Sequence, residues 1–161
     1  GQIAEAIALA GSAIELGTKR SGPDHPDVAR SVNDLAVLYD AQGRYADAEP
    51  LFKRALAIRE KALGTDHPDV ARSLGNLAEL YRAQARYAEA EPLLVGSQEG
   101  LKSAPIPNLA EQGRLRLVEL YRRWGRPADA ASMARELLRR LPADAPQRAE
   151  VERLLKAVTV R

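Results

Sequence analysis

The sequence contains no cysteine and few aromatic side chains. Among 161 residues it has five Tyr, one Trp and one Phe. Without cysteine, the chain can have no disulfide bonds, no thiolate ligands for zinc or iron–sulfur clusters and no cysteine nucleophile. Hydrophobic residues nevertheless make up 45% of the chain. A packed interior must therefore be built mainly from Ala, Leu, Val and Ile.

Long apolar segments are missing as well. No stretch approaches the roughly 18 uninterrupted apolar residues of a membrane span. The chain also does not open on a basic segment followed by an apolar one. We therefore expect a soluble, cytoplasmic protein that has no membrane partner.

The net charge of +2 is unevenly distributed. Residues 1–110 carry 12 basic and 15 acidic side chains, whereas residues 111–161 carry 12 and 7. Many Arg side chains of the basic part stand three or four positions from an acidic one, as Arg122 and Arg123 do from Glu119. This is the spacing of ion pairs on the surface of a helix. We therefore do not expect nucleic acid as the partner.

Signatures of catalysis are absent from the sequence. It has no Gly-x-Gly-x-x-Gly or Gly-Lys-Ser/Thr phosphate loop, and its serines lack motif-like partners for a nucleophilic triad. His25 and His67 would have to converge to bind one metal ion, but equivalent positions on packed helices lie about 10 Å apart. We assign both histidines to helix capping and loop hydrogen bonding. The sequence predicts a protein that is not an enzyme and has no cofactor.

The chain does contain an internal repeat with a period of 42 residues. Residues 22–51 and 64–93 are identical at 22 of 30 positions. A third, eroded copy follows, and the first residues match the second half of a unit. We expect one repeat array, divided into residues 1–20, 22–63, 64–105, 106–142 and 143–161.

Each unit is predicted to form two helices. In the first full unit, Pro26 suits the first turn of a helix after a polar cap, and Gly43 suits its end. The apolar spacing predicts helices at about 3–18, 26–41, 44–61, 68–83, 86–102, 108–123, 127–141 and 146–158. The last helix is apolar on one face and charged on the other, so we expect it to cap the end of the stack.

Small and aromatic residues recur at fixed offsets in these units, as Ala36, Tyr39, Gly43, Tyr45 and Ala48 do in the first. They resemble tetratricopeptide repeats. The 42-residue period and the phrases Asp-His-Pro-Asp-Val-Ala and Ala-Glu-Pro-Leu-Phe-Lys-Arg-Ala-Leu are similar to the repeats of kinesin light chains and of many bacterial proteins. The resemblance implies an all-α fold, a right-handed α-solenoid of antiparallel helix pairs with a C-terminal capping helix.

Stacked helix pairs turn slightly from one repeat to the next, so the first helices are expected to line a concave groove that holds a peptide. Helical spacing places these residues in the groove: Arg30, Asn33, Val37, Asp40, Arg72, Gly75, Glu79, Arg82, Gln112, Leu115, Glu119, Arg122 and Arg123, with Asp34 and Asn76 at its edge. In the resembled family an Asn on the first helix commonly contacts the main chain of a bound peptide, and Asn33 matches that position. Arg30 and Arg72 are suited to hold carboxylates.

Our leading hypothesis is a protein–protein interaction scaffold that binds a peptide or partner segment in the concave groove. The alternative is a regulatory or self-association segment of a larger protein that carries a kinase, ATPase or protease domain. It rests on the start of the chain in the middle of a repeat, which leaves an apolar face of residues 1–20 without its partner helix. A second copy could pair with that face to form a homo-oligomer.

Overall fold

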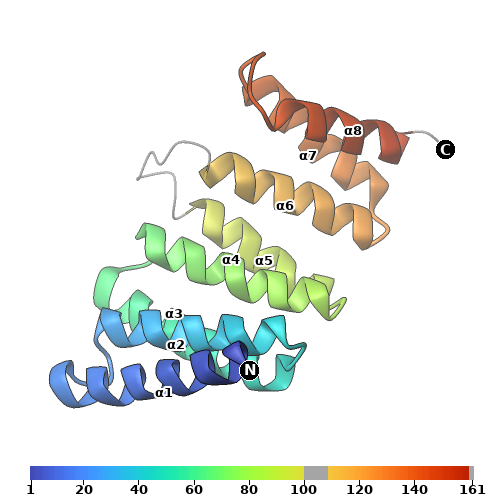
Figure 1. Ribbon diagram of the computed structural model, residues 1–161. Helices are drawn as coiled ribbons and strands as arrows, with labels where there is room; N and C mark the ends of the chain where they lie inside the picture. Colours follow the sequence, from blue (N-terminus) through green and yellow to red (C-terminus); the bar gives the residue numbers. More distant parts are fainter. Residues whose placement is uncertain (100–108, 160–161) are drawn as a thin grey trace.

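The computed structural model describes residues 1–99 and 109–159, which form eight α-helices and no strand (Figure 1). The helices are α1 (Gln2–Ser21), α2 (Pro26–Ala41), α3 (Tyr45–Leu63), α4 (Pro68–Ala83), α5 (Tyr87–Glu99), α6 (Leu109–Arg123), α7 (Pro127–Arg140) and α8 (Arg148–Thr159). The predicted all-α class is confirmed. The predicted helices at 86–102 and 108–123 extend in part into residues 100–108, outside the described residues.

The helices are stacked in sequence order. Figure 1 shows them rising from α1 at one end of the array to α8 at the other, so the two ends of the chain lie far apart. Each helix packs mainly on the helices before and after it. Such an array has no single central core, and each repeat depends on its neighbours for burial. No helix in the described part of the chain is both long and apolar enough to cross a membrane.

Small residues occupy the crossings of the helices. Eight alanines are at most 1% exposed: Ala29, Ala36, Ala48, Ala55, Ala78, Ala90, Ala130 and Ala134. Because a methyl group lets two helix axes approach closely, few large side chains are needed between them. Phe52, Tyr81 and Tyr121 are at most 9% exposed, and all three belong to one continuous buried cluster. The scarcity of aromatic residues is thus a consequence of how the array packs.

Histidine and proline set the starts of α2 and α4. The His25 Nδ1 accepts a hydrogen bond from the Asp27 backbone N–H at 3.2 Å, and His67 Nδ1 accepts one from Asp69 at 3.1 Å. Pro26 or Pro68 follows in the first turn, where a missing N–H costs nothing. The capping role expected for the two histidines is confirmed.

A repeated polar contact joins successive repeats. The Tyr81 hydroxyl donates a hydrogen bond to Glu49 on α3 at 3.0 Å, and Arg86 binds the same carboxylate at 2.6 Å. One repeat later, the Tyr121 hydroxyl donates to Glu91 at 2.6 Å, and an Arg again pairs with that carboxylate. Glu49 and Glu91 are 42 residues apart, whereas position 7, one period earlier, is Ile. The contact therefore recurs only where an acidic residue occupies this position.

The last helix covers the end of the array as expected. Val151 and Leu154 of α8 are buried against Val118, Ala134 and Leu137. The outer face of α8 carries the exposed side chains of Glu152, Arg153 and Lys156. The capping prediction is confirmed, because apolar contacts end on one side of α8 and charge begins on the other.

Candidate functional site

Polar side chains of the first helices α2, α4 and α6 contact one another from repeat to repeat. Asn76 Nδ2 on α4 donates a hydrogen bond to Asn33 Oδ1 on α2 at 3.0 Å. Arg116 Nε on α6 lies 3.8 Å from Glu79 Oε1 on α4. We call the surface along these contacts the first-helix face, defined by Arg30, Asn33, Asp34, Val37, Asp40, Arg72, Asn76, Glu79, Arg82, Arg116, Glu119 and Arg122.

Asn33 is engaged within the array. Its side chain is buried, only 8% of the residue is exposed, and its carbonyl oxygen already accepts the hydrogen bond from Asn76. Asn76 is half-buried and lies closer to solvent. An amide pair of this kind fixes the register of two first helices. The resemblance implies that Asn33 contacts the main chain of a bound peptide. That contact would compete with the hydrogen bond from Asn76, which joins two repeats.

A group of charged side chains lies at the centre of the first-helix face. Arg82 Nη2 lies 2.6 Å from Glu79 Oε2, and both side chains are half-buried. Burial and the nearby charge of Glu79 raise the pKa of Asp40 above its usual range. Asp40 and Glu79 belong to neighbouring repeats, and among the described contacts the Asp40 carboxylate has no hydrogen bond from a cation of the chain. Such a site favours an additional positive charge.

The two Arg residues near the helix starts are partly neutralised by their own helices. Arg30 Nη2 lies 3.6 Å from Asp27, and Arg72 Nη2 lies 2.6 Å from Asp69. Both guanidinium side chains are more than half exposed, at 68% and 58%. They belong to the first-helix face and are free to exchange their partners for a carboxylate of a ligand.

The remaining predicted residues differ in exposure and in position. Val37 is 44% exposed, Asp34 is exposed and Glu119 is half-buried. Arg122 is also exposed and lines a cleft of about 260 Å³ beside Pro127 and Val158. Arg122 thus points toward the α7 and α8 end, and the structure does not bring it to the Asp40–Glu79 pair.

Sequence reasoning missed Arg116 and misplaced Leu115. Leu115 packs against the core cluster that contains Val118, whereas Arg116 reaches the first-helix face. Gly75 leaves room for this guanidinium, since a Cβ atom added to Gly75 would lie 2.7 Å from Arg116 Nη1. A signal was present in the sequence: with the two-residue shortening of the third copy, Arg116 is the equivalent of Asn76.

Comparison with known proteins supports this description. The family model for the tetratricopeptide repeat matches residues 1–61 and 41–95. No curated protein matches the chain. The nearly identical TPR-like repeats of a Podosopora anserina protein described as a kinesin light chain superpose with a TM-score of 0.85 at 25% identity, covering 98% of this chain and 78% of that chain.

Two further crystal structures are similar over the same span. A variant of the Podosopora anserina protein gives a TM-score of 0.84 at 25% identity, covering 98% of this chain and 77% of that chain. BtubC (BKLC) from P. vanneervenii gives 0.85 at 22% identity, covering 98% and 65%, and shows the fold alone. The predicted right-handed α-solenoid of antiparallel helix pairs is confirmed. The chain belongs to the tetratricopeptide repeat family, and its repeats are of the kinesin light chain-like kind.

Proposed function

We propose that this chain is a non-catalytic interaction module that binds an extended segment of a partner protein along the first-helix face. Tetratricopeptide repeats generally mediate protein–protein interaction. The finer proposal rests on Asp40 and Glu79, two carboxylates of neighbouring repeats on the same face, with Glu79 near enough for its charge to raise the pKa of Asp40. A bound segment that crosses α2 and α4 would contact both carboxylates.

The chemistry of this pair specifies part of the ligand. Because burial and Glu79 disfavour the charge of Asp40, a cation placed between the two carboxylates would relieve their repulsion. Glu79 already has Arg82 at 2.6 Å from Oε2 and Arg116 at 3.8 Å from Oε1, whereas the described contacts give Asp40 no such cation. We therefore expect the bound segment to carry a Lys or Arg side chain at this point, and its carboxylates to meet Arg30 or Arg72.

A selected peptide tests the proposal without knowledge of the natural partner. A phage library of random peptides of about 12 residues, long enough to cross two repeats in an extended conformation, is selected on the immobilised chain. Selected peptides are then synthesised and their binding is measured by fluorescence anisotropy. We expect a basic residue in the selected sequences and dissociation constants in the micromolar range.

Two substitutions on the first-helix face and one elsewhere distinguish the outcomes. Asp40→Asn is expected to weaken peptide binding about tenfold, or about 1.4 kcal/mol. It should not lower the melting temperature, since Asp40 is destabilised as a carboxylate by burial and by Glu79. Arg72→Ala is expected to weaken binding of peptides that contain an acidic residue. Arg54→Ala, an exposed position on α3, serves as the matched control and should leave binding unchanged.

Equal binding to wild type and to Asp40→Asn would contradict the assignment of the site. Loss of binding in Arg54→Ala, with binding kept in Asp40→Asn and Arg72→Ala, would place the peptide on the second helices, on the side of α3. Selected peptides with no preference for basic residues would remove the role given to the Asp40–Glu79 pair.

A further inference from the structure

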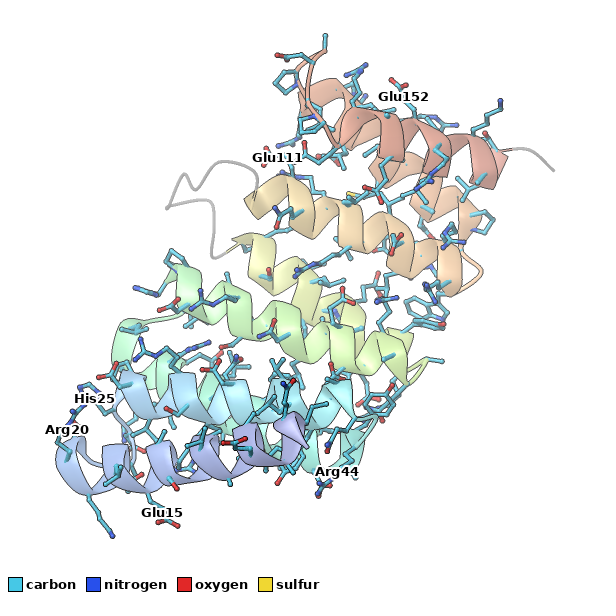
Figure 2. The ribbon with its side chains drawn as sticks, viewed as in Figure 1. Glu15, Arg20, His25, Arg44, Glu111 and Glu152 are labelled. Carbon is cyan, nitrogen blue, oxygen red and sulfur yellow. The ribbon has the colours of Figure 1, made fainter. Side chains whose placement is uncertain are left out.

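A cleft of about 430 Å³ opens between α1 and the start of α2, away from the Asp40–Glu79 pair. It is lined by Ala13, Leu16, Gly17, Arg20, Asp27, Arg30 and Ser31. In Figure 2, Arg20 and His25 lie near one another at this end of α1, whereas Glu15 points away from it. Of its lining residues, only Arg30 also belongs to the first-helix face.

The internal repeat shows what occupies the same place one period later. Adding 42 to Gly17 gives Arg59, and adding 42 to Ser31 gives Ser73. Arg59 is only 3% exposed, and its Nη1 donates to Ser73 Oγ at 2.6 Å and to the Asp69 carbonyl oxygen at 3.4 Å. In the second repeat, then, a guanidinium fills the space between the two helices.

The first repeat keeps the acceptors but lacks the guanidinium. Ser31 Oγ, to which no arginine donates among the described hydrogen bonds, donates instead to the Asp27 carbonyl oxygen at 3.3 Å. These two groups are the equivalents of Ser73 Oγ and the Asp69 carbonyl. Gly17 has no side chain to reach them, and the cleft lies at the position that is equivalent to that of Arg59 in the next repeat.

Both places have an Arg–Asp pair beside them, but the cleft has one more cation at its rim. Arg72 and Asp69 lie beside the buried Arg59, and Arg30 pairs with Asp27 at 3.6 Å beside the cleft. Arg20 adds one cation at the rim, at the exposed end of α1. The precedent of Arg59 shows that a guanidinium is accommodated next to such an Arg–Asp pair.

The rim of the cleft adds an apolar requirement. Leu16 is 67% exposed and Leu9 is 65% exposed, whereas Ile58, the equivalent of Leu16, is 5% exposed beneath α2. A ligand that covers these leucines must offer apolar side chains next to its cation.

We propose that the Gly17 cleft is a binding site for an arginine side chain of a partner protein, presented with apolar neighbours that cover Leu9 and Leu16. The guanidinium donates to Ser31 Oγ and to the Asp27 carbonyl oxygen, as Arg59 does to their equivalents. Arginine suits the site better than lysine because its planar group donates to two separated acceptors at once. Gly17 acts as the determinant that keeps the site open.

The test is an NMR titration of the ¹⁵N-labelled chain with Nα-acetyl-arginine amide, and with the lysine and citrulline amides in parallel. We expect saturable shifts of the Gly17, Asp27 and Ser31 amide signals with a dissociation constant on the order of 10 mM. The lysine and neutral citrulline amides should bind at least threefold more weakly. Equal shifts with all three probes would overturn the proposal.

Three variants make the result specific. Gly17→Arg should abolish the chemical-shift response to the arginine amide, because its own side chain fills the cleft. Ser31→Ala adds no bulk and should weaken binding of the arginine amide about fivefold. Arg59→Gly should open an equivalent cleft, so that the arginine amide also shifts Ser73. A response unchanged in Ser31→Ala, or absent at Ser73 in Arg59→Gly, would overturn the assignment. Sedimentation at the NMR concentration tests whether a second copy of the chain covers this face instead. A dimer whose amide signals do not shift with the arginine amide would show that the second copy occupies the face.

Discussion

Replacement of Glu49 with Gln should destabilise the array at neutral pH and much less in acid. The Glu49 carboxylate binds Arg86 at 2.6 Å and Lys53 at 2.7 Å, and it accepts the Tyr81 hydroxyl hydrogen bond at 3.0 Å. Arg86, then Lys53 and Tyr81, lower the pKa of Glu49 to about 2. Gln keeps the size of the side chain but removes the negative charge to which Arg86, Lys53 and Tyr81 donate.

The magnitude follows from the pKa. A decrease from the ordinary value of 4.5 to about 2 corresponds to about 3 kcal/mol of stability at neutral pH. The Glu49 side chain is 20% exposed and Lys53 is 54% exposed, so solvent screening reduces the effect. We therefore expect Glu49→Gln to cost about 2 kcal/mol at pH 7.

The pH dependence has a definite sign. Because the pKa of Glu49 is lowered in the folded state, its contribution is complete above about pH 5 and is lost as the pH falls toward 2. Roughly half should remain at pH 3. The difference in stability between wild type and Glu49→Gln should shrink accordingly.

Urea unfolding followed by circular dichroism, at pH 7 and at pH 3, measures both values. Glu60→Gln on the exposed side of α3 is the matched control and should change stability by less than about 0.5 kcal/mol at pH 7. A loss below about 0.5 kcal/mol for Glu49→Gln at pH 7 would refute the reasoning. So would a loss of the same size at pH 3 and at pH 7.

Four further substitutions have expected outcomes. Ala85 has a φ of 57° in the turn where Gly43 has 72°, so Ala85→Gly should stabilise the chain by about 0.5–1 kcal/mol and Gly43→Ala should destabilise it by a similar amount in thermal unfolding. Gly75→Ala should stabilise the chain by up to about 1 kcal/mol. The added Cβ would lie 2.7 Å from Arg116 Nη1, the movable end of a flexible side chain. A lower melting temperature would show that Arg116 cannot move. Burial and Glu91 raise the pKa of Tyr121 to about 12, so stability should fall between about pH 10 and 12. Tyr121→Phe should remove the highest tyrosine step from an ultraviolet titration, and persistence of that step would contradict the assignment.

Much of the fold could be predicted because local chemistry marks the ends of its helices. The bounds 26–41 and 68–83 agree with α2 and α4 at both ends, since proline fixes each start. Glycine after a helix was a less complete guide. Ala85 adopts the same positive φ as Gly43 although it lacks the conformational freedom of glycine.

The candidate site was only partly predictable. Helical spacing identifies which residues leave the core, and Glu79 and Asn76 make contacts across the first helices, with Arg116 and Asn33. It could not show that the Asn33 side chain already accepts a hydrogen bond from Asn76, because that bond depends on the register between two repeats. The cleft at Gly17 could have been found by comparing equivalent positions, since Arg59 stands one period later.

A ¹⁵N chemical-shift map of a library-selected peptide on the full chain tests the central claim most directly. Binding on the first-helix face predicts perturbed signals for Asp34, Val37 and Asp40 on α2 and for Asn76 and Glu79 on α4, with α3 and α5 surfaces unaffected. Perturbations confined to the exposed sides of α3 and α5, with Asp40 and Glu79 unchanged, would contradict it.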